Sequence, residues 1–368
     1  MKVFLKILIS LLIIVLLLFA FFEFNHFINK SKMPDDNITS ETTPVSNEPS
    51  EEEIANMKVT DFSVSNNGWL SVNGSSLVNN KHQKIQLTGV SSHGIQWFYD
   101  VLSSSNLDYL KNEWKINVFR IAMYSDAYVA NPDEIKLKLT TLVDEAIDLD
   151  MYVIIDWHIL SDNDPNIYID QSNAFFNAMS LKYKDCPNVI YEICNEPNGN
   201  EVSWRGYVKP YAEKIIPTIR SNSPDSLIIV GTPDYCKKLK QVADEPLDFE
   251  NIAYSCHFYA GSHGQELRDE IKYVLDKNLC VFVSECGSTD YTGNGNNYYD
   301  SFSTWINFLN ENNISWIYWS FANKNEGASL IQSTYDPLNE AMNVDDYLTD
   351  FGIFLKKMFI DNYNNLQN

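Results

Sequence analysis

Two glutamates that end apolar segments are the residues of this chain best suited to acid–base chemistry. Glu196 ends the run that precedes Pro197, and Glu285 ends a run that is followed by Cys286 and Gly287. The residues before each glutamate are typical of β-strands, so both carboxylates should project from the C-terminal ends of strands. Hydrolysis of a glycosidic bond needs two such acids, one to protonate the leaving oxygen and one to attack the sugar or to activate water.

Eight short β-prone runs follow one another along the chain, and the two glutamates follow the fourth and the seventh. Several of the runs are apolar on both faces, which is typical of strands in a parallel sheet that helices cover. The runs are Ile85–Val90, Val118–Met123, Tyr152–Asp156, Val189–Ile193, Leu227–Val230, Ile252–Cys256, Val281–Ser284 and Ser315–Trp319.

Helical patterns separate these runs. Apolar residues recur at helical spacing, and the expected helices are Leu107–Asn112, the stripe from Leu139 to Ile147, Asn173–Tyr183, Pro210–Ile219, Glu266–Leu275, the stripe from Phe302 to Leu309 and Tyr347–Ile360. The repeat of roughly 30 residues is the size of one βα unit. Eight units predict an α/β fold, a (β/α)8 TIM barrel. A doubly wound sheet is the alternative, but it would lack polar residues at nearly every strand end.

An opening β-hairpin is expected before the barrel. Residues 69–72 and 83–87 flank Asn73-Gly74, which is a common turn sequence. We expect this N-terminal hairpin to close the bottom of the barrel.

Polar residues gather where the predicted strands end, at the face that carries the active site in such barrels. Each of them has a purely structural explanation, because an Arg can pair with a carboxylate and a His is more often hydrogen-bonded than catalytic. Together they are harder to explain in that way, since buried charges destabilise a fold unless they are paired. The group comprises His93, Trp97, Arg120, Tyr124, Asp156, His158, Asn195, Glu196, His257, Tyr259, Glu285 and Trp319.

Three parts of the chain differ in composition. Residues 1–30 resemble a signal peptide or signal anchor, because Lys2 and Lys6 precede an apolar run to Phe22 that lacks an A-x-A-like cleavage site. An uncleaved membrane tether through residues 3–22 is favoured over a fully secreted form, and either places the enzyme outside the cell. Residues 31–57 are polar and acidic and predict a disordered linker. Residues 58–368 are expected to form the (β/α)8 catalytic domain.

Charge and ligand spacing exclude several functions. The net charge of −22 argues against nucleic acid as a partner, because phosphate binding needs clustered Lys and Arg. The chain has no C-x-x-C pair for zinc, and its six cysteines are expected to be mostly buried apolar residues. Asp162 and Asp164 begin a calcium-like spacing, but Ile167 stands where Gly is needed. We therefore expect no metal and no cofactor. We also expect a monomer.

Several motifs resemble glycoside hydrolase family 5, and most of all its bacterial endoglucanase branch. The resemblance runs in order through about residues 60 to 360, and its motifs are specific as a set, although Asn-Glu-Pro alone would mark only a wider clan. The matching segments are Gly89–Trp97, Asn117–Arg120, Val153–Pro165, Tyr191–Pro197, His257–Gln265 and the Ser-Glu-x-Gly around Glu285. Cys286 departs from the family, in which Trp usually follows the nucleophile.

The resemblance implies a retaining mechanism with unequal glutamates. Glu196 would be the acid/base, with a pKa raised by the nearby charge of Glu285, and Glu285 the nucleophile, about 5–5.5 Å away. Supporting roles would fall to Arg120 and Tyr259 as hydrogen-bond donors to Glu285, Asn195 at the sugar 2-hydroxyl, His257 in the carboxylate network, and His93 and His158 at the distorted sugar.

The same resemblance assigns residues to the sugar chain. Trp319 and Trp97 would stack beneath sugars, Tyr235 would stand where relatives carry Trp on the leaving-group side, and Lys324 and Glu326 would bind distal sugars. Tyr124 is also assigned to substrate binding. The implied function is a retaining endo-β-1,4-glucanase (cellulase) acting on a β-glucan. A β-mannanase of the same clan and a non-catalytic glycan-binding protein are the alternatives, and the presence of both glutamates disfavours the second.

Overall fold

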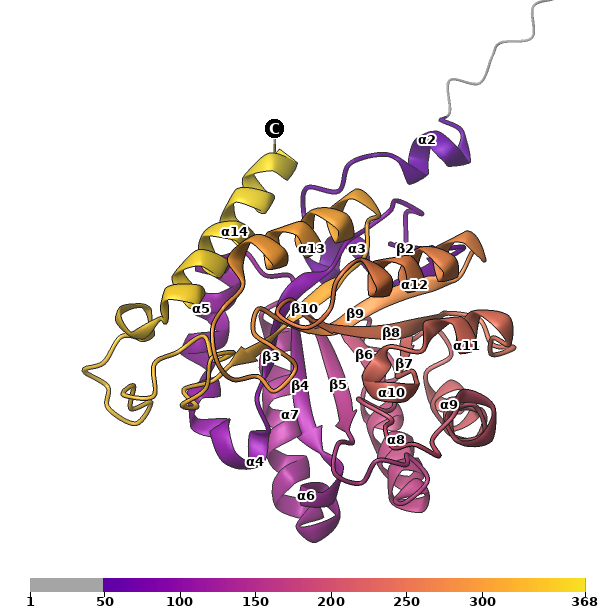
Figure 1. Cartoon of the computed structure of the whole chain (residues 1–368), viewed down its shortest axis with the longest axis horizontal. Coiled ribbons are helices and arrows are strands. Elements are labelled where there is room, and N and C mark those ends of the chain that lie inside the picture. Colours follow the sequence, from indigo (N-terminus) through magenta and orange to yellow (C-terminus); the bar gives the residue numbers. More distant parts are fainter. Residues whose placement is uncertain (1–48, 368) are drawn as a thin grey trace, which may run out of the picture. The chain divides into compact units, whose positions relative to one another are not determined.

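The computed structural model describes residues 49–367, whose centre is a closed barrel of parallel strands (Figure 1). The strand order is β10-β3-β4-β5-β6-β7-β8-β9, so each strand pairs with its neighbours in sequence and the last closes on the first. All eight predicted strands are confirmed, with small shifts at their ends. Their bounds are β3 (Thr88–Ser92), β4 (Val118–Tyr124), β5 (Tyr152–His158), β6 (Val189–Glu192), β7 (Ile228–Val230), β8 (Ile252–Tyr259), β9 (Cys280–Gly287) and β10 (Trp316–Phe321).

Helices surround the barrel, and α14 lies beside α5 (Figure 1). Every predicted helix is present, although the last begins at Asp350 and a separate 3-10 turn covers Val344–Tyr347. The helices are α2 (Glu51–Ala55), α3 (Val64–Asn67), α4 (Ile95–Phe98), α5 (Ser104–Trp114), α6 (Ser125–Ala130), α7 (Pro132–Asp148), α8 (Ile169–Lys182), α9 (Lys209–Asn222), α10 (Pro233–Cys236), α11 (Leu239–Asp244), α12 (Gln265–Asp276), α13 (Tyr299–Glu311) and α14 (Asp350–Gln367).

The expected hairpin exists, but its second strand lies earlier in the chain than residues 83–87. Strand β1 (Ser71–Asn73) pairs with β2 (Ser76–Val78) through a tight turn in which Gly74 has a φ of 62°. The chain therefore reverses at once, and residues 83–87 contribute only a bridge between Val78 and Lys84.

An apolar cluster closes the end of the barrel where the strands begin. We call this cluster the floor. The N-terminal segment contributes Leu70 and Leu77 from around the hairpin, together with Ile85 and Leu87. The hairpin thus covers the bottom of the barrel, as predicted. Inward-facing strand residues complete the floor, among them Val118, Tyr152, Ile154, Ile190, Ile229, Phe282 and Ile317.

The segment before the barrel is described only from residue 49. Here Glu51–Ala55 forms helix α2, in which Ser50 and Glu53 cap each other's backbone N–H groups, so this part of the expected disordered linker is helical. Within residues 49–367 no helix is long and apolar enough to cross a membrane. The expected tether, residues 3–22, lies outside the described residues.

The six cysteines form no disulfide, and all lie within the described residues. Five are buried, while Cys186 is partly exposed. Burial raises the pKa of the Cys286 thiol well above its usual range, so this side chain stays protonated and packs as a small apolar residue in the core.

Candidate active site

A layer of charged side chains lies directly above the floor, inside the barrel. Arg120 follows Val118 by two residues on β4, and Glu192 follows Ile190 by two on β6. Side chains two residues apart on a strand face the same way. The same strands therefore supply apolar residues to the floor and polar ones to the layer nearer the mouth.

Arg120 is the centre of this layer and is fully buried. Its Nε lies 2.7 Å from Glu192 Oε2, its Nη2 lies 2.9 Å from Asp156 Oδ2, and its Nη1 lies 3.1 Å from Glu285 Oε2. Nη2 also donates to Asn195 Oδ1 at 2.7 Å. One guanidinium therefore orients three carboxylates and an amide, and its charge cannot neutralise all three.

Glu285 reaches the interior because strand β9 contains a bulge. From the pair Ser255–Phe282 to the pair His257–Glu285, the register advances two residues along β8 but three along β9. Such a bulge re-aims a side chain, and here both Ser284 and Glu285 face inward. Besides Arg120, Tyr259 donates its hydroxyl to Glu285 Oε1 at 2.8 Å. Both carboxylate oxygens are therefore held by donors.

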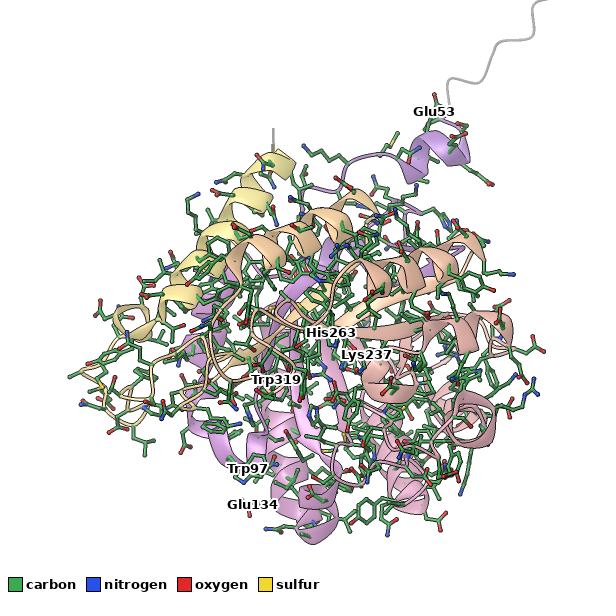
Figure 2. All side chains as sticks on the ribbon, in the orientation of Figure 1. Glu53, Trp97, Glu134, Lys237, His263 and Trp319 are labelled. Carbon is green, nitrogen blue, oxygen red and sulfur yellow. The ribbon has the colours of Figure 1, made fainter. Side chains whose placement is uncertain are left out.

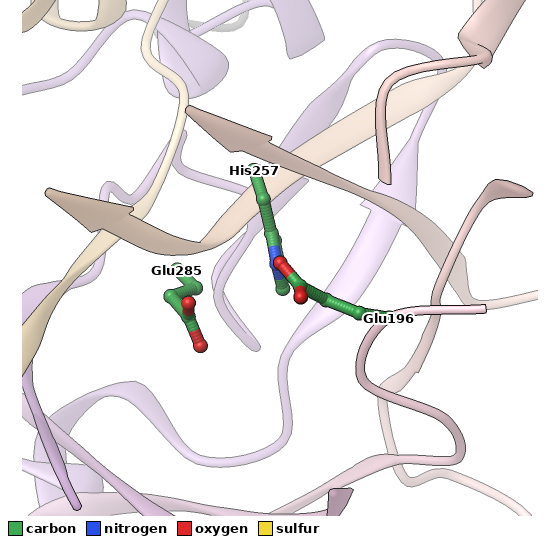
Figure 3. Close-up of side chains that lie close together, drawn as sticks. All are labelled: Glu196, His257 and Glu285. Atoms are coloured by element: carbon green, nitrogen blue, oxygen red, sulfur yellow. The ribbon is translucent and has the colours of Figure 1, made fainter. Parts of the chain in front are cut away.

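Glu196 faces Glu285 across the barrel mouth and is held by a different partner. Its Oε1 lies 2.8 Å from His257 Nδ1, and Figure 3 shows its carboxylate against the His257 ring, with Glu285 facing them. One oxygen of each glutamate lies within 4.8 Å of the other. This spacing suits attack by one carboxylate, because inverting enzymes keep theirs roughly 6.5–9.5 Å apart to admit a water.

The two glutamates open into a cleft of about 440 Å³. Figure 2 shows Lys237, His263 and Trp319, which all line it. Arg120 and Asn195 are buried behind the cleft, and Trp97 lies at its edge with its side chain 62% exposed and its ring 5.0 Å from that of Tyr124. The other predicted residues in the lining are His93, Tyr124, His158, Tyr235, His257, Tyr259, Lys324 and Glu326.

The model for cellulases of glycosyl hydrolase family 5 matches residues 78–325. The chain belongs to this family.

Curated relatives in the family are named as endoglucanases. One from Clostridium saccharobutylicum is 45% identical over 292 residues, which cover 79% of this chain and 64% of that one. Endoglucanase A of Evansella cellulosilytica is 47% identical over 255 residues, which cover 69% of this chain and 52% of that one. The chain thus matches about half to two thirds of the length of these relatives.

Solved family 5 structures share the fold. The catalytic domain of Thermobifida fusca endoglucanase Cel5A superposes with a TM-score of 0.75 at 33% identity, over 81% of this chain and 99% of that one. A variant of that domain has been solved in complex with cellotetraose.

The pKa values of the two glutamates run opposite to the family-based expectation. Burial alone would raise the pKa of Glu196, but the hydrogen bond and charge of His257 outweigh it and lower that pKa. Burial and the nearby charge of Glu196 raise the pKa of Glu285. The expected raised pKa of Glu196 is therefore wrong for the free protein, because His257 holds a proton against it.

The histidines on the other wall are neutral. Burial, then the charge of Lys324, lowers the pKa of His93 to about 3, and the Gly94 N–H donates to its Nδ1 at 2.7 Å. Burial, then Arg120, lowers the pKa of His158 to about 4, and its Nδ1 lies 2.6 Å from Asp156 Oδ2. Both rings are thus fixed as neutral polar groups beside Trp319, whose ring stacks on that of His158 at 5.2 Å.

Asn195 has less freedom than its family role suggests. Its Oδ1 accepts from Arg120, and its Nδ2 donates to the Ile159 carbonyl at 3.0 Å. One amide hydrogen is left, on the side of His158 Nε2, which lies 3.4 Å away. A sugar hydroxyl that binds Asn195 must therefore compete with this long contact to His158 Nε2.

A left-handed turn holds the loop that carries Glu196. Asp234, Tyr235 and Cys236 have φ values of 59°, 57° and 57°, a conformation that costs roughly 1–2 kcal/mol per residue. The Tyr235 N–H donates to the Pro197 carbonyl at 3.1 Å, and the Cys236 thiol donates to the Asn195 carbonyl at 2.9 Å. The turn thus fixes the loop that carries Glu196 while it presents the Tyr235 ring to the cleft.

Sequence reasoning missed two groups of site residues. The first group is Glu192 and Ser284, which lie in the charged layer. Glu192 follows the floor residue Ile190 by two positions, and this spacing would have revealed it. Lys237, His263 and Tyr291 line the cleft from loops. No periodicity marks loop residues, so only the fold could place them.

A metal is not needed to explain this cluster. Glu196, His257 and Glu285 bring ligand atoms within 4.8 Å of one another. The pairing of Glu285 with Arg120 and of Glu196 with His257 already accounts for these atoms through hydrogen bonds. We interpret the three as an acid–base set.

Proposed function

We propose that this chain is a retaining endo-β-1,4-glucanase that hydrolyses internal bonds of cellulose or a related β-glucan by double displacement. The observation that carries the proposal is the pair of glutamates within 4.8 Å, each held by different partners at the base of one cleft. The names of the curated relatives, and a related domain bound to cellotetraose, support a β-1,4-glucan as the substrate.

In the first step Glu285 attacks the anomeric carbon while Glu196 protonates the leaving oxygen. The carbon–oxygen bond to the leaving sugar breaks, and an ester bond to Glu285 forms. Arg120 and Tyr259 hold the attacking carboxylate and favour its ionised form. The proton on the leaving oxygen comes from the Glu196–His257 pair.

In the second step Glu196 acts as the base. It takes a proton from a water that attacks the anomeric carbon, and the ester bond to Glu285 breaks. The product therefore keeps the β configuration, and the Glu196–His257 pair regains the proton that it gave away.

The other residues in and beside the cleft would bind the sugar chain. Trp319, Trp97, Tyr124 and Tyr235 supply aromatic surfaces for sugar rings, and Lys324 and Glu326, 2.6 Å apart, supply polar contacts at one end. His93 and His158 contact the sugar as neutral groups, and Asn195 reaches its 2-hydroxyl.

We also propose that the enzyme acts outside the cell as a monomer. The apolar run through residues 3–22 would tether it to the membrane, residues 31–57 would act as a spacer, and residues 58–368 would carry catalysis. Comparing the N-terminus of the mature protein with Met1 would test whether the run is removed.

The activity is tested by reducing-sugar release from carboxymethyl cellulose and from β-mannan. We expect glucan to be the better substrate and the initial product to be the β anomer by proton NMR. Glu285→Gln should abolish release, whereas the exposed Glu266→Gln in α12 should not change it. Undiminished activity of Glu285→Gln, or an initial α anomer, would overturn the mechanism, and better release from mannan would overturn the substrate.

A further inference from the structure

A buried chain of hydrogen bonds runs beneath the acid/base. Glu192 Oε1 lies 2.6 Å from Ser284 Oγ, Ser284 Oγ lies 3.0 Å from His257 Nε2, and His257 Nδ1 lies 2.8 Å from Glu196 Oε1. Glu192, Ser284 and His257 are at most 2% exposed. The mechanism above uses only the outer end of this chain.

The direction of every hydrogen bond in the chain follows from Glu192. The Arg120 guanidinium, whose Nε lies 2.7 Å from Glu192 Oε2, and the His257 ring, whose Nε2 lies 3.9 Å from Glu192 Oε1, overcome burial and lower the pKa of Glu192 to about 2, so this carboxylate is ionised and only accepts. The proton between Glu192 and Ser284 must then be the serine's own. Because a hydroxyl has a single proton, Ser284 Oγ must accept from His257.

The ring of His257 therefore carries a hydrogen on Nε2. Ser255 does not change this conclusion. Its hydroxyl lies 2.6 Å from Ser284 Oγ, and because the Ser284 proton already points to Glu192, Ser255 must donate to Ser284 Oγ. Only Nδ1, which faces Glu196, is left free to gain or lose a proton.

We propose that Glu192, acting through Ser284, is a positioning residue that fixes the Nε2–H tautomer of His257 so that Nδ1 exchanges the acid/base proton with Glu196. The inference rests on the proposed function, since it names how the acid of that reaction is kept loaded. In the resting pair, Nδ1–H donates to the Glu196 carboxylate. As Glu196 protonates the leaving oxygen, the Nδ1–H bond breaks and the proton passes to Glu196, which leaves a neutral ring still protonated at Nε2.

The surroundings of His257 favour the protonated ring. Burial alone would lower its pKa, but Cys236, and after it Glu192 and Glu196, raise it well above the usual range. The groups that act on it from the surrounding elements are the carboxyls of Asp156, Glu192, Glu196 and Glu285 and the thiols of Cys236, Cys256 and Cys286. Glu192 differs from the rest because it also dictates which nitrogen is protonated.

The first experiment observes the tautomer directly by nitrogen NMR of histidine-labelled protein, with the His257 signals assigned from their loss in His257→Gln. We expect Nε2 to remain protonated throughout the titration of the wild type. In Glu192→Gln the new amide can donate to Ser284, which frees the serine proton for His257 Nε2 and shifts the hydrogen to Nδ1. Ser284→Ala should mix the tautomers, whereas Ser255→Ala should keep the wild-type state. An unprotonated Nε2 in the neutral wild-type ring would overturn the proposal.

The second experiment compares leaving groups. For glucan, whose leaving oxygen needs a proton, we expect Glu192→Gln to lower kcat by about 10²-fold, the lower end of what general acid catalysis contributes. For 2,4-dinitrophenyl β-cellobioside, whose leaving group departs without a proton, the rate should hardly change. The basic limb of kcat/KM should move to lower pH, because loss of the Glu192 charge lowers the pKa of the Glu196–His257 pair.

The outcomes separate this inference from the proposed function. Equal loss of activity on both substrates would mean that Glu192 is merely structural, and would overturn the inference. A wild-type protein that cleaves no β-1,4-glucan would instead overturn the function, while the NMR result would still decide the tautomer.

Discussion

The floor of the barrel and the charged layer above it come from the same strands, yet they contribute to the protein in opposite ways. Moving two residues along a strand replaces an apolar side chain by a polar one on the same inward face. The pairs are Val118 and Arg120, Ile154 and Asp156, Ile190 and Glu192, and Phe282 and Ser284.

The difference lies in what burial does to each layer. In the floor, burial removes apolar surface from water and stabilises the fold by roughly 25 cal/mol per Å². In the charged layer, burial raises the free energy of each ion, and pairing offsets that cost without exceeding it by much. We infer that the floor supplies stability and that the layer above uses part of it to hold ionised groups in place.

The largest effect should come from removing the centre of the charged layer. Arg120→Met would leave carboxylates buried without their cation, and we expect a loss of about 3–5 kcal/mol of unfolding free energy together with the activity. The loss should shrink at low pH, because protonated carboxyls no longer need the guanidinium. Urea unfolding at pH 7 and pH 5 measures the loss of unfolding free energy and its dependence on pH.

Arg205→Met provides a matched control, because the Arg205 side chain is 82% exposed and pairs with Glu245 at the surface. It should change stability by less than about 0.5 kcal/mol. An Arg120→Met protein as stable as the wild type would contradict the view that the layer depends on this cation.

A floor substitution should be costly in a different manner. Ile154→Ala removes a fully buried side chain and should cost about 2–5 kcal/mol. Because no charge is involved, the cost should be the same at pH 7 and pH 5, and kcat of the folded fraction should be unchanged. A cost that depends on pH would mean that the two layers are coupled.

This contrast also explains which features the sequence could reveal. The eight strands were predictable because strands buried on both faces are apolar throughout, and the helices because their stripes repeat at helical spacing. Glu196 and Glu285 were found as acids at strand ends. The second strand of the hairpin was misplaced, because residues 83–87 are as β-prone as Ser76–Val78 and only the tight turn at Gly74 distinguishes them.

The side-chain directions and pKa values of the charged layer were harder to predict from the sequence. Strict alternation from Phe282 turns Ser284 inward and Glu285 outward, and the bulge that turns both inward depends on pairing with β8. The order of the pKa values was wrong for a similar reason, because it depends on the hydrogen bond from His257 to Glu196. Contacts between distant strands decide both features.

Removing one tyrosine hydroxyl from the charged layer and one from the floor tests the difference between the two layers with a smaller change. Tyr259→Phe deletes a donor to ionised Glu285, and we expect activity to fall by about 10- to 100-fold, in line with 1.5–3 kcal/mol for a hydrogen bond to a charged group. The acid limb of the rate should move to higher pH, because the pKa of Glu285 rises further without this donor. Tyr152→Phe deletes a hydroxyl in the floor that donates to the Gly68 carbonyl at 2.8 Å, and it should leave the pH profile unchanged. An unshifted acid limb in Tyr259→Phe would show that this donor does not tune the nucleophile.

The smallest effect should come from the rim of the cleft, where neither burial nor charge holds the side chain. Tyr291 is 72% exposed on the loop after β9, which its own N–H ties to Ser262 Oγ at 2.9 Å. The exposed ring of this anchored loop is suited to contact a sugar, and Tyr291→Ala should weaken binding of long cello-oligosaccharides by about 0.5–1.5 kcal/mol. KM should rise about 2- to 10-fold at unchanged kcat and stability, whereas the exposed Ile353→Ala on α14 should change nothing. A fall in kcat instead would mean that the loop positions Glu285, and the rim would then belong to the charged layer rather than to substrate binding.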